Sequence, residues 1–295
     1  MRLAPLTTIL AFAALATASA QSADPAVRLY HPPTPLLSYE VATIKPIDAK
    51  AADGMVKLPP GMSVSPLSVR RYIMNAYGAM YAAQIVGGPD WLSKDAYNIK
   101  AKAPDDVEAA FQKMNFSDRG DQTHSMQQSL LADRFHLKAH FETRILPVYE
   151  LVPAKSGLKI TEVPAPPERK PADLPTRMSP GDPLPPGSMM TMLNSNGLRV
   201  TNGNAIKMQS LLRVLGGMGS PETGDRPVVD RTGFTGCFDI KDLTWAPLGD
   251  ATATNTPDVP SLTMALEEKL GLKLIPAKDP VEVLVIDSID RPSPD

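Results

Sequence analysis

The stretch Pro280-Val281-Glu282-Val283-Leu284-Val285 decides the fold, because a similar pattern has already occurred once in the chain. The stretch Pro147-Val148-Tyr149-Glu150-Leu151-Val152 lies 133 positions earlier. Both are short apolar runs that predict β-strands. The two parts of the chain are also similar in the predicted helices and strands that precede these stretches.

An amphipathic helix precedes the strand in each part of the chain. Both helices have apolar residues at positions i, i+3, i+4 and i+7, which form one face of a helix. These residues are Val69, Tyr72, Ile73 and Ala76 in the first helix, and Met208, Leu211, Leu212 and Leu215 in the second. The two sets lie 139 positions apart, and a glycine, Gly78 or Gly217, follows each helix as a stop signal.

Further elements repeat in the same order. Alternation of apolar and polar residues predicts a strand at 97–100 and another at 238–241, which is 141 positions later. A second helix ends at Phe135 in the first part and at Leu270 in the second, an offset of 135. Four matches in order favour a duplicated unit of helix, strand, helix, strand and strand. The alternative is amphipathic patterning of the kind that any α+β chain has.

The predicted fold is α+β, with two similar tandem units joined by a Pro-rich linker. Each unit is expected to be a small antiparallel or mixed sheet with helices on one face, because its strands alternate apolar and polar residues. The units span residues 38–163 and 188–295. Nine prolines lie between Pro164 and Gly187, and proline excludes both a helix and a central strand, so 164–187 is interpreted as an extended linker.

The first twenty residues predict a secretion signal. Arg2 is their only charge, an apolar run follows, and Ala18-Ser19-Ala20 provides small residues where a signal peptidase cleaves. The apolar run is shorter than the roughly 20 residues that span a bilayer. We therefore expect a signal peptide at 1–20, a loose tail at 21–37, and no stable membrane span after cleavage.

Charge and cysteine content exclude several classes of protein. The formal net charge of −2 argues against a nucleic-acid-binding protein, which would have a basic stripe. Cys237 is the single cysteine in the sequence, so an internal disulfide is impossible and packing must stabilise the fold. Burial or neutral exposure of Cys237 is favoured over a catalytic role.

Several strings in this sequence resemble a known family. They are Tyr39 to Pro46, Gly87 to Leu92, Leu130 to Leu137, Pro227 to Gly236, Leu270 to Leu274 and Pro280 to Asp287. Together, from about Tyr39 to the C-terminus, they resemble a soil-associated family of exported bacterial proteins that acidobacterial genomes carry in many copies. That family is uncharacterised, so the resemblance implies no catalytic residues. Some of its members carry the domain behind a membrane metallopeptidase of the antibiotic-sensor type, which implies ligand sensing as one expectation.

The sequence contains only weak matches to metal-binding and catalytic motifs. His136 and His140 have the spacing of helical metal ligands, but Phe135, Leu137, Ala139 and Phe141 alternate with polar residues and predict a strand instead. Residues four apart in a strand are about 13 Å apart, too far to hold one ion. The Ser156–Lys159 spacing and the glycines at 216–219 are interpreted as a turn and a helix cap. No catalytic, cofactor-binding or metal-binding residue is predicted, and no cofactor.

The sequence therefore predicts an exported, non-catalytic binding or interaction protein of the cell envelope, in the periplasm or outside the cell. The expected partner is another envelope protein or a small ligand. Two alternatives remain open: a ligand-sensing domain, related to the antibiotic-sensor-type peptidase fusions, and an extracytoplasmic hydrolase with an unrecognised site.

Overall fold

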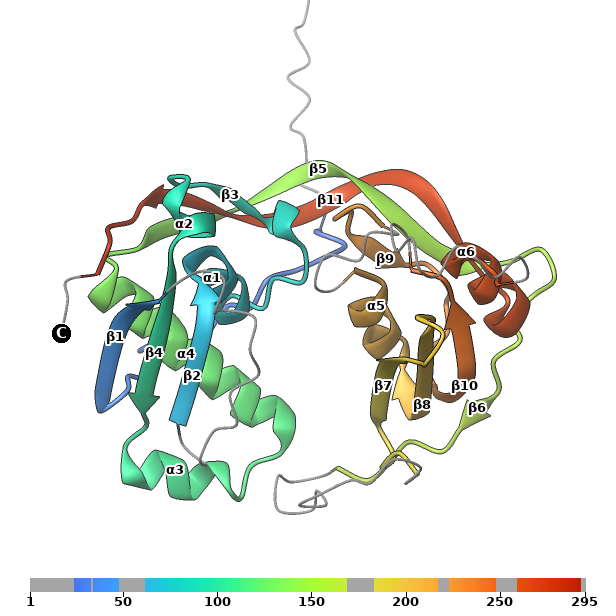
Figure 1. Ribbon diagram of the computed structural model, residues 1–295, viewed down its shortest axis with the longest axis horizontal. Coiled ribbons are helices and arrows are strands. Elements are labelled where there is room, and N and C mark those ends of the chain that lie inside the picture. Colours follow the sequence, from blue (N-terminus) through green and yellow to red (C-terminus); the bar gives the residue numbers. More distant parts are fainter. Residues whose placement is uncertain are drawn as a thin grey trace, which may run out of the picture.

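The computed structural model describes residues 24–32, 34–47, 62–168, 183–216, 223–247 and 259–292. It has three β-sheets with helices packed against them (Figure 1). The mixed α+β class predicted from the sequence is confirmed. The predicted signal peptide at 1–20 and the middle of the Pro-rich linker, 169–182, lie outside the described residues.

The first half of the protein runs from β1 to β5. Its antiparallel sheet has the order β1-β4-β2, formed by β1 (Val41–Ile47), β4 (Ala96–Lys102) and β2 (Met62–Ser68). The other elements here are α1 (Val69–Ala76), η2 (Ala82–Gln84), β3 (Ile85–Gly87), α2 (Trp91–Lys94), α3 (Asp105–Phe111), α4 (Phe116–Arg134) and β5 (Lys138–Pro153).

The second half runs from β6 to β11. Its antiparallel sheet has the order β6-β10-β8-β7, formed by β6 (Glu162–Val163), β10 (Cys237–Trp245), β8 (Arg199–Lys207) and β7 (Ser188–Leu193). The other elements are α5 (Met208–Gly216), β9 (Val228–Asp230), α6 (Leu262–Ala265), the π-helical turn η5 (Leu266–Leu270) and β11 (Leu272–Ser288).

The two predicted amphipathic helices form and bury the expected faces. All four apolar residues of α1 are buried, and so are all four of α5. In the first half they pack with Tyr97 and Ile99 of β4, and in the second with Phe238 and Ile240 of β10. Ser68 caps α1, since its side chain accepts a hydrogen bond from the backbone N–H of Arg71.

The third sheet connects the halves. The long strands β5 and β11 pair antiparallel along their length and run across the top of both halves in Figure 1. The short strand β3 of the first half pairs with β11, and the short strand β9 of the second half pairs with β5, so the order is β3-β11-β5-β9. Each half thus contributes a short strand that pairs with the long strand of the other half.

The register of this sheet differs from the alignment of the two sequence stretches. Ile85 of β3 lies opposite Leu284, and Val228 of β9 lies opposite Tyr149. Positions 149 and 284 each lie opposite the first residue of a short parallel strand, and they differ by 135 rather than 133. The difference of two residues keeps every side chain on the same sheet face, which is why the apolar pattern alone did not distinguish the two alignments.

The segment at 26–31 is attached to β11, although the sequence predicted a loose tail over 21–37. Backbone hydrogen bonds join Ala26 to Pro280 and Val27 to Glu282. The Glu282 carboxylate, which is largely buried, accepts a hydrogen bond from the backbone N–H of Leu29 at 2.7 Å and lies 3.0 Å from His31 Nε2. These contacts join residues more than 250 positions apart, so sequence periodicity contains no sign of them.

Candidate functional site

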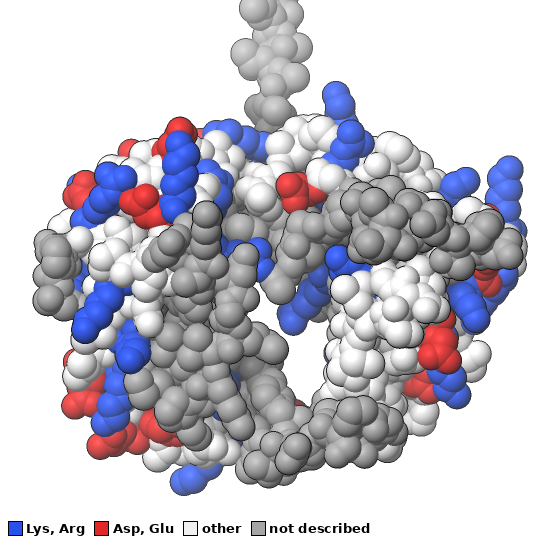
Figure 2. Space-filling model, in the orientation of Figure 1, with Lys and Arg blue, Asp and Glu red and all other residues white. Residues whose placement is uncertain are grey.

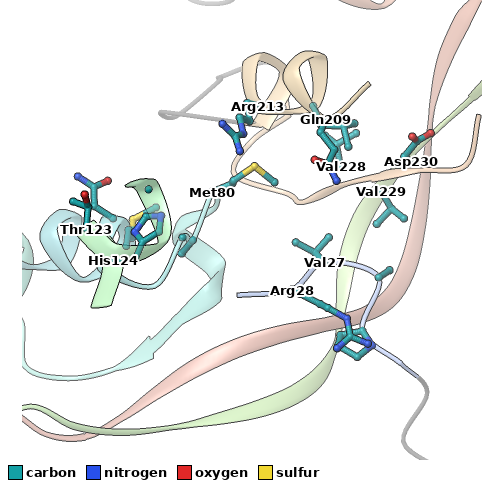
Figure 3. A pocket seen from close by; sticks show the side chains of 18 of the residues that line it. Val27, Arg28, Met80, Thr123, His124, Gln209, Arg213, Val228, Val229 and Asp230 are labelled. Carbon is teal, nitrogen blue, oxygen red and sulfur yellow. The ribbon is translucent and has the colours of Figure 1, made fainter. Parts of the chain in front are cut away.

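A cavity of about 990 Å³ lies between the two halves, lined by residues of both. Its walls come from the attached N-terminal segment, α1, the loop after α1, α4, α5 and β9 with the residue after it (Figure 3). Ligand pockets in proteins measure about 300–1,000 Å³. The cavity is therefore large enough for a small organic molecule.

Helical periodicity places the side chains that line the cavity. One face of α4 contributes Arg119, Gly120, Thr123, His124 and Gln127, which have helical spacing. The apolar faces of α1 and α5 pack on their own sheets, so their adjoining faces are directed to the cavity. Those faces contribute Met74 and Asn75 from α1, and Gln209 and Arg213 from α5, while Leu212 of the apolar face of α5 also reaches the lining.

The cavity is lined by more positive than negative charge. Arg28, Arg119, Arg213 and Arg231 line it, whereas Asp230 is the single carboxylate among the described residues of the lining. Lys and Arg side chains border the opening between the two halves in Figure 2. The positive charge of the lining is only partly compensated, because some of these arginines form ion pairs with carboxylates and others do not.

Two of the arginines are already paired. Arg231 makes two hydrogen bonds to the Asp279 carboxylate, at 2.9 and 3.0 Å. Arg28 lies 3.1 Å from Asp24. By contrast, Arg119 and Arg213 form no ion pair with any residue in the described part of the chain.

His124 lies where the two halves approach each other. Its ring is 5.0 Å from the ring of Tyr30. Burial lowers the pKa of His124, and the positive charge of Arg213 lowers it further, while a hydrogen bond with the backbone of Asn75 and the charge of Asp121 act in the opposite direction. Arg213 belongs to α5 and His124 to α4, so this contribution to the lowered pKa comes from the other half of the protein.

Gln127 is the most buried polar side chain of the lining. It is only 7% exposed, and its Oε1 atom has no hydrogen-bond partner. Buried polar groups in folded proteins are paired in the great majority of cases. The unpaired oxygen has almost no accessible surface, so it is enclosed within the wall and is not an open acceptor on the cavity.

Among its described residues, the lining contains one hydroxyl side chain. This hydroxyl, that of Thr123, donates to the backbone oxygen of Arg119 at 2.8 Å and is not directed to a general base. Asp230 accepts two hydrogen bonds from Thr232 in a local turn. Among the residues described, no group of three or more His, Cys, Asp or Glu side chains is placed to hold a metal ion.

The two histidines singled out in the sequence lie away from the cavity. His140 is on β5, and its ring nitrogens lie 3.0 Å from Asp287 and from Glu142. Hydrogen bonds to Asp287 and then to Glu142 raise the pKa of His140. His136 precedes β5 and lies 3.2 Å from Asp290. The structure thus gives each histidine its own carboxylate partner.

The other residues that the sequence analysis considered for a chemical role take part in packing or end a helix. Cys237 is buried at the start of β10. Gly216 ends α5 against the ring of Tyr81, where a Cβ atom would lie 1.9 Å from a ring carbon.

The residues that line the cavity were not identified from the sequence. The one signal present was the polar face of α4, which is also what an ordinary solvent-exposed helix would show.

Fold and site together define a mixed α+β protein with a cavity between two halves that share a sheet. The chain belongs to the family described as "Protein of unknown function (DUF3738)", whose model matches residues 70–289. This match includes both long strands and all of the second-half sheet, whereas β1 and β2 of the first half precede it. No curated protein and no solved structure matches the chain. Within the described residues, no helix is both long and apolar enough to cross a membrane.

Proposed function

We propose that this protein is an exported, non-catalytic binding protein of the cell envelope that holds a small ligand in the cavity between its halves. The cavity itself is the observation that carries the proposal. It has a suitable volume, and its wall combines apolar side chains with a few polar groups, as ligand sites usually do. Five separate segments of the chain converge on it, so a ligand would stabilise their arrangement.

The sensing role implied by the family resemblance is a more specific form of the same proposal. A ligand that contacts both halves binds best when α4 and α5 are correctly spaced. Binding would therefore be coupled to the relative position of the halves, which is the physical requirement for a sensor. Support comes from the cavity wall, in which Arg119 and His124 belong to the first half and Gln209 and Arg213 to the second.

We also propose that the two halves are tandem copies of one unit, joined by the Pro-rich linker at 164–187. Three arrangements support this proposal. The neighbours β4 and β2 correspond to β10 and β8; α1 follows β2 as α5 follows β8; and the β3–β11 pairing corresponds to the β9–β5 pairing. In this scheme the cavity lies where the two copies face each other.

The proposed function can be tested by filling the cavity. Gln209 is exposed on α5 and lines the cavity, so Gln209→Trp should obstruct it with little effect on stability. Compounds from a library of anionic, cationic and neutral fragments are expected to bind the unaltered protein in ligand-observed NMR, but not this variant. Lys207→Trp is the control, because it adds the same bulk at an exposed position outside the lining.

The outcome distinguishes the cavity from other surfaces. Fragments that bind all three proteins equally would place the binding site elsewhere. Complete absence of binding to the unaltered protein would contradict a small-ligand role and favour an interaction with another protein.

Export is proposed from the Ala18-Ser19-Ala20 site. We expect the protein to be recovered from the periplasm or the medium with Gln21 as its first residue, because signal peptidase cleaves after such a site. N-terminal sequencing of the recovered protein measures this directly. Exported protein that still begins with Met1 would contradict the proposal.

A further inference from the structure

We propose that the ligand of the central cavity is a small organic anion, whose carboxylate or phosphate head contacts Arg119 and Arg213 and whose apolar body lies beside the methionines of the wall. This inference rests on the proposed function and specifies the chemistry of its ligand. Four observations support it.

The first observation is the unpaired charge of two arginines from opposite halves. Arg119 of α4 and Arg213 of α5 both line the cavity, and neither has a carboxylate partner in the described part of the chain. Two cations that face one cavity repel each other, and an anion between them converts this repulsion into attraction. The guanidinium group also matches the planar or tetrahedral oxygens of carboxylates and phosphates.

The second observation is that the other two arginines of the wall already have carboxylate partners. Arg231 is bound to Asp279, and Arg28 is paired with Asp24. Asp230, the single carboxylate among the described residues of the wall, accepts two hydrogen bonds from Thr232 on its Oδ1 atom. Four arginines thus line the wall together with one carboxylate, and two of these arginines have no carboxylate partner in the described part of the chain: Arg213, and Arg119, whose guanidinium lies 5.5 Å from the centre of the Phe111 ring. The charge of the wall therefore favours an anion over a cation.

The third observation is the buried amide of Gln127. Its Oε1 atom is unpaired, lies in a side chain that is 7% exposed, and belongs to the same face of α4 as Arg119. The oxygen itself has almost no accessible surface, so a ligand donor would reach it only after the Gln127 side chain turned toward the cavity.

The fourth observation is the apolar part of the wall. Met74 of α1 and Met80 of the loop that follows it line the cavity, together with Val27, Leu212 and Val228. Methionine side chains are flexible and adapt to ligands of different shape. Figure 3 shows Met80 on the same side of the cavity as Arg213. The wall therefore suits a molecule with a charged end and an apolar end.

The test uses the mature protein and three probes that share one apolar chain: octanoate, octanol and octylamine. Isothermal titration calorimetry at low salt is expected to show octanoate binding at least about tenfold more tightly than octylamine, since a charge-assisted hydrogen bond contributes about this factor. Octyl phosphate is a fourth probe, and its affinity relative to octanoate distinguishes the two kinds of anionic head.

Substitution of the two arginines tests where the anionic head of the ligand binds. Arg213→Gln and Arg119→Gln should each weaken octanoate binding by about tenfold and leave octanol binding unchanged. Lys273→Gln, which removes one positive charge from an exposed position on β11, should have no effect on either probe. Arg213 is exposed on its helix, so its substitution should not impair folding, and equal melting temperatures verify this.

A spectroscopic measurement gives an independent readout. Because Arg213 contributes to lowering the pKa of His124, an anion bound to Arg213 should raise that pKa. NMR titration of the His124 ring should show the rise with octanoate but not with octanol. The neighbouring charged and titratable groups, Asp121 and Tyr30, are present in both experiments and do not account for a difference between the probes.

The possible failures are distinguishable. If octanol and octylamine bind as tightly as octanoate, and Gln209→Trp blocks all three, the cavity binds ligands but the proposed anion preference is wrong. If octanoate binding is insensitive to both arginine substitutions, the head lies elsewhere and the inference is also wrong. If no probe and no library fragment binds, the proposed function fails together with the inference.

Discussion

Replacing Tyr81 by alanine is expected to destabilise the protein by about 3–5 kcal/mol, the range for truncating a buried aromatic side chain. Tyr81 is 1% exposed and packs with Val148, Val229 and Val281 under the third sheet. Its hydroxyl accepts a hydrogen bond from the backbone N–H of Val228 at 2.9 Å, although Tyr81 belongs to the first half and Val228 to the second. Urea unfolding of the mature protein measures the change in the free energy of unfolding.

Two further variants separate packing from hydrogen bonding at this position. Tyr81→Phe keeps the ring but leaves the buried N–H of Val228 unpaired, which should cost about 1–3 kcal/mol. Gly216→Ala adds a Cβ atom that would lie 1.9 Å from the Tyr81 ring, so the ring or α5 must move. If Tyr81→Ala changed stability by less than the Phe variant, the ring would not join the two halves as the structure indicates.

Truncation of a buried helix residue in either half is expected to cost about 2–5 kcal/mol, through lost transfer free energy and a residual cavity. The variants are Ile73→Ala in α1 and Leu211→Ala in α5, since both side chains are 0% exposed. Because the halves share the third sheet, we expect each variant to lower the stability of the whole chain in one unfolding transition. Urea unfolding followed by both circular dichroism and tryptophan fluorescence tests this, with Trp91 in the first half and Trp245 in the second.

Arg213→Ala is the matched control for Leu211→Ala, because Arg213 is an exposed position on the same helix. Its effect on stability should be within about 0.5 kcal/mol. A separate transition for each half would show that the shared sheet does not couple them. A large loss of stability with Arg213→Ala would show that this arginine has a structural role, and would weaken its assignment to a ligand.

Local structure was predictable where side-chain periodicity reports burial. The faces of α1 and α5, with Ile73 and Leu212 among their apolar residues, were predicted because an amphipathic helix repeats its contacts every 3.6 residues. The strand containing Tyr97 and Ile99 was predicted because alternate residues face the core. The predicted strand starting near Phe135 begins later, since β5 starts at Lys138 and His136 has a φ of 50°.

The candidate site was not predictable, because its residues share no local pattern. Arg119 and Arg213 are ordinary surface arginines in the sequence, and only the fold places both in one cavity wall. Gln127 lies in a polar helix whose buried side is visible only when the neighbouring elements are in place. The unpaired state of a charge or an amide depends on which groups surround it in space.

The sequence by itself determined the amphipathic helices α1 and α5, the strands β4, β5, β10 and β11 in outline, and the α+β class, since these depend on contacts between residues a few positions apart. Only the tertiary structure decided that β3 pairs with β11 and β9 with β5, that Glu282 fixes the segment near Leu29, and that a cavity separates the halves. The physical reason is that strand pairing and cavity walls join residues far apart in the chain. Periodicity shows which side of an element is buried, but not which element buries it.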